Sequence, residues 1–217
     1  MSLGDVYIWF ILLAAITAFS AFFLKKISLF LYFFPFYLLT TFCVEYLGIW
    51  LSDNGKTTTL LYNIFSTFEF MFYFWILRTI ISNRKMKSIL ICIMIVYPLL
   101  VILNMLLLQK GTLQFHTLTY SLGCFIIVGC TIAYFYELFQ SNKSIDLVRD
   151  PYFWICSGLL FFYSCGYPLL AVSNFFAAPT NVFIQNYNSI SSLLNILLYS
   201  SFIIASLCRI KTRKFSS

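Results

Sequence analysis

Charged side chains are scarce in this chain of 217 residues. They form 10% of the sequence, whereas a soluble domain carries about 25%. Hydrophobic residues reach 61%, and the mean hydropathy is +0.90. Most side chains must therefore face lipid or other apolar helices, and this excludes a soluble catalytic or binding domain.

Histidine and the common catalytic motifs are also missing or rare. The chain holds a single histidine, His116, and contains neither HExxH, nor GxSxG, nor a Gly-rich phosphate-binding loop. The last apolar run, 184–208, has no lysine that could bind retinal and no NPxxY sequence of the kind found in G-protein-coupled receptors. We predict no catalytic residues, no metal site and no cofactor, while a lipid-modifying enzyme stays open as a third kind of function.

The cysteines lack the spacing of a disulfide framework or a metal site. All seven occur without a CxxC pair or a Cys/His cluster, and almost all fall inside apolar runs. In that setting a free cysteine behaves as a small buried apolar residue. We predict that the cysteines serve packing.

Apolar runs long enough to cross a bilayer recur along the chain. A spanning helix needs about 20 mostly apolar residues, and polar breaks divide the sequence into such runs. The predicted helices are 4–24, 28–51, 58–82, 87–109, 112–139, 151–173 and 184–208. They predict an all-α bundle of seven transmembrane helices forming one domain, 1–217, with a basic cytoplasmic tail over 209–217. Because 174–185 stays apolar, six or eight spans remain open.

Short turn signals separate these helices. Asn54-Gly55 favours a backbone with positive φ and predicts a tight turn. Asp150-Pro151 predicts an N-cap followed by proline in the first helical position. Lys25-Lys26 interrupts an apolar run that is too long for one span, so the lysine pair predicts a turn there.

Lysine and arginine predict the orientation in the membrane, because they concentrate in short cytoplasmic loops. With seven helices, twelve basic residues fall on one side and only Lys56 and Lys110 on the other. The twelve are Lys25, Lys26, Arg78, Arg84, Lys85, Lys87, Lys143, Arg149, Arg209, Lys211, Arg213 and Lys214. We therefore predict an outside N-terminus and a cytoplasmic C-terminus. This scatter of basic residues among short loops does not form a nucleic-acid-binding patch.

Two carboxylates lie inside the second and third predicted helices. Ionisable groups inside a membrane are costly and usually have a function. At about 1.5 Å of rise per residue, Glu45 and Asn63 come to similar depths on antiparallel helices, and Glu69 falls near the midplane. Asn63, Ser66, Glu69 and Tyr73 follow one slanting row. We predict that Glu45, Asn63 and Glu69 line a site that binds a ligand or takes up a proton.

Further polar residues are predicted to join this site. Asn195 and Tyr199 follow a polar row on the last helix, and Asn104 and His116 lie in the outer half of the fourth and fifth helices. The alternative is that these side chains only connect helices through hydrogen bonds. Glu137, at the basic end of the fifth helix, is predicted to pair with Arg78 or Arg84.

Three runs of the sequence resemble a group of bacterial membrane proteins. These runs are EYLGIW at 45–50, LYNIFSTFEF at 61–70 and NILLYSSF at 195–202. They are similar to runs in small uncharacterised seven-helix proteins of Bacteroidetes-type bacteria. The resemblance implies a location in a bacterial inner membrane and does not imply any particular activity.

Taken with the absence of soluble domains, these features predict a small ligand-binding sensor or receptor-like module. Its partners would be the lipid bilayer and a protein at its basic face, and no nucleic acid. A small-molecule or proton-coupled transporter that uses an intramembrane glutamate is the alternative. A structural subunit of a membrane complex also stays open.

Overall fold

The computed structural model describes residues 3–20, 29–108, 115–140, 146–175 and 182–214, and every regular element in these ranges is helical. These ranges contain seven α-helices, the number of helices predicted. The chain divides into two compact units. Unit 1 comprises Met1–Phe42 and Asn142–Ser217, and unit 2 comprises Cys43–Ser141.

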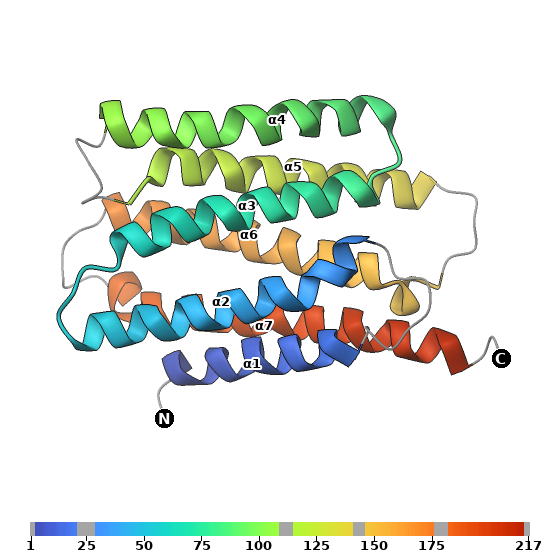
Figure 1. Ribbon diagram of the computed structural model, residues 1–217, viewed down its shortest axis with the longest axis horizontal. Helices are drawn as coiled ribbons and strands as arrows, with labels where there is room; N and C mark the ends of the chain where they lie inside the picture. Colours follow the sequence, from blue (N-terminus) through green and yellow to red (C-terminus); the bar gives the residue numbers. More distant parts are fainter. Residues whose placement is uncertain (1–2, 21–28, 109–114, 141–145, 176–181, 215–217) are drawn as a thin grey trace. The chain divides into compact units, whose positions relative to one another are not determined.

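The helices follow one another along the chain in the order shown in Figure 1. Their bounds are α1 Leu3–Phe19, α2 Leu29–Asp53, α3 Thr59–Ile80, α4 Arg84–Leu103, α5 Thr117–Gln140, α6 Pro151–Phe175 and α7 Val182–Lys214. A π-helical turn, η2 (Asn104–Leu108), continues α4, and a 3-10 turn, η3 (Leu147–Arg149), precedes α6. Helix α2 contributes residues to both units.

Unit 2 is built on α3, which contacts both α4 and α5 (Figure 1). Its centre is aromatic: the ring of Phe70 lies 5.6 Å from that of Tyr97 on α4 and 5.1 Å from that of Tyr120 on α5. Phe74 adds a further edge contact with Tyr97 at 5.4 Å. Gly123 on α5 has no side chain where the Phe70 ring lies, so α3 and α5 approach closely at this level.

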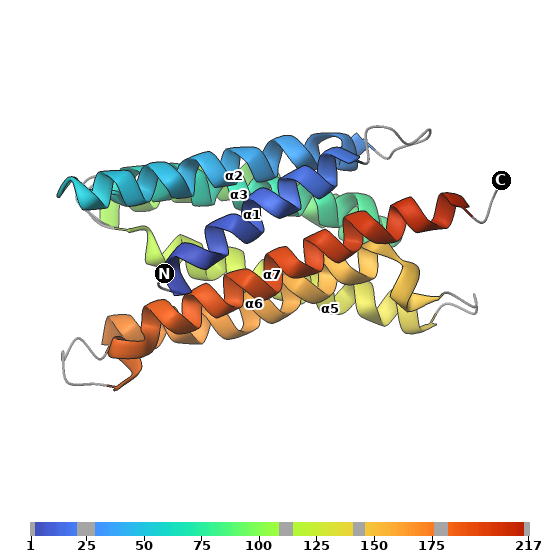
Figure 2. The same ribbon diagram turned by 90° about the horizontal axis from the view of Figure 1, so that it is seen from below.

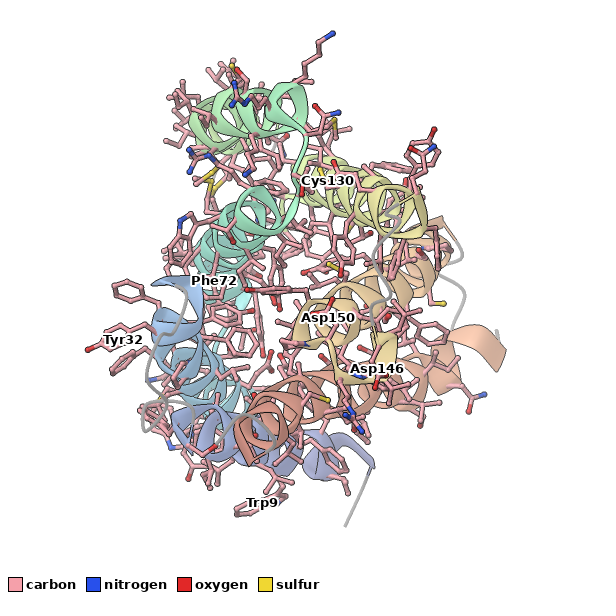
Figure 3. The ribbon with its side chains drawn as sticks, turned by 90° about the vertical axis from the view of Figure 1, so that its right-hand side faces the viewer. Trp9, Tyr32, Phe72, Cys130, Asp146 and Asp150 are labelled. Carbon is pink, nitrogen blue, oxygen red and sulfur yellow. The ribbon has the colours of Figure 1, made fainter. Side chains whose placement is uncertain are left out.

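Unit 1 is organised by α7, which packs against α1 and α6 (Figure 2). Helix α1 buries Ala14, Ala15 and Ala18, and small residues of this kind let membrane helices approach closely. Large apolar side chains on the other faces stay exposed. Trp9 and Tyr32 are 56% and 46% exposed and point away from their helices in Figure 3.

Five of the described helical segments are long and apolar enough to cross a membrane. They are Tyr32–Asp53, Thr59–Ile80, Arg84–Leu107, Thr117–Gln140 and Asn186–Cys208. Exposed apolar side chains repeat at helical spacing along α4 and into η2, as expected of a face that contacts lipid; they are Ile91, Ile95 and Ile102 of α4 and Leu106 of η2. The chain is a membrane-embedded helical protein, while the orientation and the full number of spans stay predictions.

The predicted turns are confirmed where the structure describes them. Gly55 has a φ of 67°, and the backbone N–H groups of Gly55 and Lys56 bond back to Ser52 and Leu51. Helix α6 begins at Pro151, and Asp150 Oδ1 accepts the N–H of Tyr152 at 3.0 Å. The Lys25-Lys26 turn lies outside the described residues.

Most helix ends differ from the prediction by a few residues, and two of the differences bear on the site and on the tail. Helix α5 begins at Thr117 rather than at 112, because the N–H of His116 bonds to the side chain of Asn63 instead of continuing the helix. Helix α7 continues to Lys214, so 209–214 of the predicted tail are helical. Prolines lie inside α2, α4 and α6, where membrane helices tolerate them.

Candidate functional site

Five of the seven predicted site residues belong to unit 2. Glu45 lies on α2, Asn63 and Glu69 on α3, Asn104 at the start of η2, and His116 directly before α5. Asn63, Asn104 and His116 are buried, whereas Glu45 and Glu69 are partly exposed. This difference in burial separates a closed polar network from two accessible carboxylates.

His116 is the centre of the closed network and is completely buried. Its backbone N–H donates to Asn63 Oδ1 at 3.1 Å. On the ring, Nε2 lies 2.8 Å from Ser66 Oγ and 3.2 Å from the backbone oxygen of Asn63. Nδ1 lies 2.9 Å from Thr119 Oγ1. His116 therefore joins the N-terminal half of α3 to the first turn of α5.

Helix α4 joins the same network through Thr119. Asn104 Nδ2 donates to Thr119 Oγ1 at 3.1 Å, and the Tyr97 hydroxyl donates to the backbone oxygen of Thr119 at 3.1 Å. Asn104 opens the π-helical turn, a local widening of the helix that is often found at functional sites. The network thus connects α3, α4 and α5 at one end of unit 2.

The partners of His116 assign its protonation. A backbone carbonyl can only accept, so the contact with the Asn63 oxygen places a proton on Nε2. Ser66 remains free to donate its own proton to the Tyr62 oxygen at 2.6 Å. Nδ1 then accepts from the Thr119 hydroxyl, which in turn accepts from Asn104. The neutral tautomer with its proton on Nε2 fits these contacts, and the Thr119 hydroxyl also lies 3.2 Å from the backbone oxygen of His116.

Burial sets the protonation behaviour of His116, which precedes the span Thr117–Gln140. Removal from water disfavours the charged imidazolium and lowers the pKa of His116 below its ordinary value of 6.5. The unfolded chain therefore binds a proton at higher pH than the folded one. The stability that neutral His116 contributes is present above pH 6.5 and is lost as the pH falls through its folded pKa.

This linkage makes a testable prediction. Thermal unfolding in detergent between pH 7.5 and pH 5 should show a falling midpoint for the wild type, with at most about 1.4 kcal/mol of stability lost per pH unit from this one group. His116→Gln should show a shallower fall, since it lacks the imidazole but keeps the carboxylates Glu45 and Glu69. Parallel pH profiles for the two proteins would contradict the assignment.

The two accessible carboxylates each have a tyrosine as a hydrogen-bond donor. The Tyr73 hydroxyl donates to Glu69 Oε1 at 3.2 Å, one turn along α3. Glu69 also interacts electrostatically with Tyr97 of α4 and Cys124 of α5. The Tyr62 hydroxyl donates to Glu45 Oε2 at 3.3 Å, across the turn between α2 and α3.

Glu45 on α2 is joined to α3 through Tyr62, and the predicted pairing of Glu45 with Asn63 is not among these contacts. Tyr62 lies where a side chain on Gly48 would otherwise be, so the glycine makes room for the phenol ring beside Glu45. Asn63 points to His116 instead, through its Oδ1. The polar row predicted on α3 therefore serves two purposes, since Asn63 and Ser66 bind His116 while Glu69 and Tyr73 form a pair of their own.

Glu137 does not pair with arginine as predicted. Its Oε2 accepts the backbone N–H of Ser82 at 2.7 Å, and its Oε1 accepts that of Asn83 at 3.1 Å. These amides precede α4 and would otherwise lack partners. Within the described residues, neither Arg78 nor Arg84 forms an ion pair. A carboxylate bound to two amides at the start of a helix is a stable alternative to a surface ion pair.

Asn195 and Tyr199 belong to unit 1. Asn195 Nδ2 donates to the Ser191 oxygen of its own helix at 3.0 Å. Tyr199 is buried, and its ring meets that of Phe202 edge-on at 5.9 Å. Both side chains lie on the polar row that the sequence predicts for the last helix.

Thr119 and Tyr97 were not predicted from the sequence. Thr119 follows His116 by three residues at the start of a helix, and this spacing is a usable signal for side chains on one face. Tyr97 carries no such signal, because its contact with Thr119 joins positions 22 residues apart. No group of His, Cys, Asp and Glu in the described part of the chain could hold a metal ion.

No protein-family model, no curated protein and no solved structure matches this chain.

Proposed function

We propose that this protein is a small membrane sensor that binds a cationic or hydrogen-bond-donating ligand at Glu69. The proposal rests on the position of Glu69 on α3. The carboxylate is partly exposed within an apolar helical segment, Thr59–Ile80, and it accepts a hydrogen bond from Tyr73. A carboxylate in an apolar setting attracts a cation or a hydrogen-bond donor strongly.

The surroundings of Glu69 favour a fixed receptor site. The network around His116 ties α3 to α4 and α5, and its α3 member Ser66 lies three residues before Glu69. Preorganised elements of this kind reduce the cost of ordering a site on binding. Helix α3 also carries Arg78 in its last turn, so one rigid element connects the carboxylate to the basic end.

Signal output would occur through a protein partner at the basic face. The last turns of α7 carry Arg209, Lys211, Arg213 and Lys214, a set of cations suited to an acidic partner. We place the protein in a bacterial inner membrane, as its resemblance to proteins of Bacteroidetes-type bacteria implies.

A proton-coupled transporter is the second candidate, and the Glu45–Tyr62 pair favours it. Two carboxylates at different levels, each with a phenol donor, are groups that could take up and release protons along a path. A carrier would move protons with its substrate, whereas a sensor would bind the ligand without flux.

The experiment compares ligand binding and flux in one set of variants. The probe is a panel of primary alkylamines, with the matching alcohols as neutral controls. We expect an amine to raise the unfolding temperature of the wild type, because saturation at a hundred times Kd adds about 2.7 kcal/mol. Glu69→Gln should abolish the shift, and Glu45→Gln should retain it. An equal shift in Glu69→Gln would overturn the proposed site.

Proteoliposomes with an internal pH-sensitive dye separate the two functions. A sensor should give no amine-driven change of internal pH beyond that of protein-free vesicles. Flux that Glu69→Gln abolishes would establish the carrier instead.

A further inference from the structure

The basic end of unit 2 gathers four cations around the turn between α3 and α4. Arg78 lies in the last turn of α3, and Arg84, Lys85 and Lys87 lie in the first turn of α4. Arg84 and Lys85 are exposed, and Arg78 and Lys87 are partly buried. Within the described residues, none of the four forms an ion pair.

Glu137 contacts this turn, and its two carboxylate oxygens are already used. Both accept backbone N–H groups, from Ser82 and Asn83. The Asn83 side chain caps α4 by accepting the N–H groups of Lys85 and Met86. The turn is therefore held by its own polar groups, and its cations remain available to an external anion.

Arg78 is the residue of this turn that points most directly to a phosphate ligand. Its Nε is buried and has no hydrogen-bond partner. A guanidinium group presents several donors in a fixed plane and binds phosphate oxygens in a bidentate manner. A buried donor of this kind indicates a missing acceptor at the end of α3.

The location identifies the anion. The apolar segments Thr59–Ile80 and Arg84–Leu107 end and begin at this turn, which places it at a membrane boundary. Exposed Ile89 and Ile91 follow directly on α4 and would face acyl chains. Headgroup phosphates lie at that level, and basic residues next to a span attract anionic lipids.

We propose that this basic turn is a binding site for the phosphate of an anionic phospholipid, with Arg78 as its deepest contact. Arg84 and Lys85 hold the headgroup from the exposed side. The site is independent of the ligand site at Glu69, and its failure would leave that proposal intact.

Quenching of a single tryptophan tests the site. Trp75 lies one turn before Arg78 on α3, so the variant with Trp9, Trp50 and Trp154 replaced by phenylalanine reports on this end of unit 2. The probes are vesicles of brominated phosphatidylglycerol or brominated phosphatidylcholine. We expect stronger quenching by phosphatidylglycerol, and Arg78→Gln should lower its relative binding constant about fivefold.

Further variants keep the test decisive if Arg78→Gln does not fold. Lys85→Gln, at an exposed position, should lower the preference for phosphatidylglycerol, and an unchanged preference in both variants would overturn the proposal. The matched control is Lys56→Gln. Lys56 lies just before α3, at the opposite end of this helix from Arg78, so its loss should leave the preference unchanged. An equal drop in this control, or displacement of the lipid by inorganic phosphate, would also overturn a phospholipid site.

Discussion

Replacing His116 with alanine is expected to lower the free energy of unfolding by about 2–3 kcal/mol. The substitution removes the ring contacts with Ser66, Thr119 and the Asn63 oxygen and leaves a cavity at a fully buried position. Hydrogen bonds between membrane helices contribute about 0.6–1.7 kcal/mol each. The loss of several of them at once should therefore destabilise the protein more than a typical substitution does. Unfolding of the protein in bicelles by steric trapping measures the difference.

The matched control for this prediction is Asn195→Ala. The amide of Asn195 donates to Ser191 on the same helix, so its loss should cost well under 1 kcal/mol. The comparison distinguishes a polar group that joins helices from one that bonds within its own helix. Equal losses in the two variants would mean that the His116 network does not hold α3, α4 and α5 together.

Gly123→Ala is expected to destabilise the protein by about 1–3 kcal/mol through overpacking. A Cβ at this position would lie 2.8 Å from Cε1 of Phe70. The Phe70 ring is fully buried between Tyr97 and Tyr120, so it has no open space into which to move. Helices α3 and α5 must separate to admit the methyl group.

Gly129→Ala on the same helix provides the control. Nothing lies within 4 Å of a Cβ at Gly129, so the only expected effect is the gain in helix propensity, up to about 1 kcal/mol. The two variants make the same chemical change in α5 and should shift stability in opposite directions. Destabilisation of similar size in both would show that the Phe70 contact is not the cause.

Much of the fold could be predicted from local signals in the sequence. Asn54-Gly55 marks a chain reversal, and Asp150-Pro151 marks the start of a helix. Both could be predicted because the backbone preferences of these residues act within a few positions. Apolar runs long enough to cross a bilayer predict the helices, and this signal too is contained within each segment. The start of α5 was missed because a distant side chain, Asn63, captures the N–H of His116.

The candidate site was predictable only in part. The sequence identified Asn63, Glu69, Asn104 and His116 as polar residues in apolar surroundings, and three of them prove to be members of one network. It could not assign partners. Glu137 was expected to meet an arginine, yet it bonds to two backbone amides, which no side-chain pattern reveals.

By itself, the sequence determined that this protein is a bundle of apolar helices with a few polar residues inside it, since composition and helical period depend on each segment alone. Only the tertiary structure decided which polar residues meet. His116 and Asn63 are 53 positions apart, and their contact depends on how α3 and α5 pack around Phe70 and Gly123. That packing separates the buried network around His116 from Glu69, the carboxylate that remains accessible to a ligand.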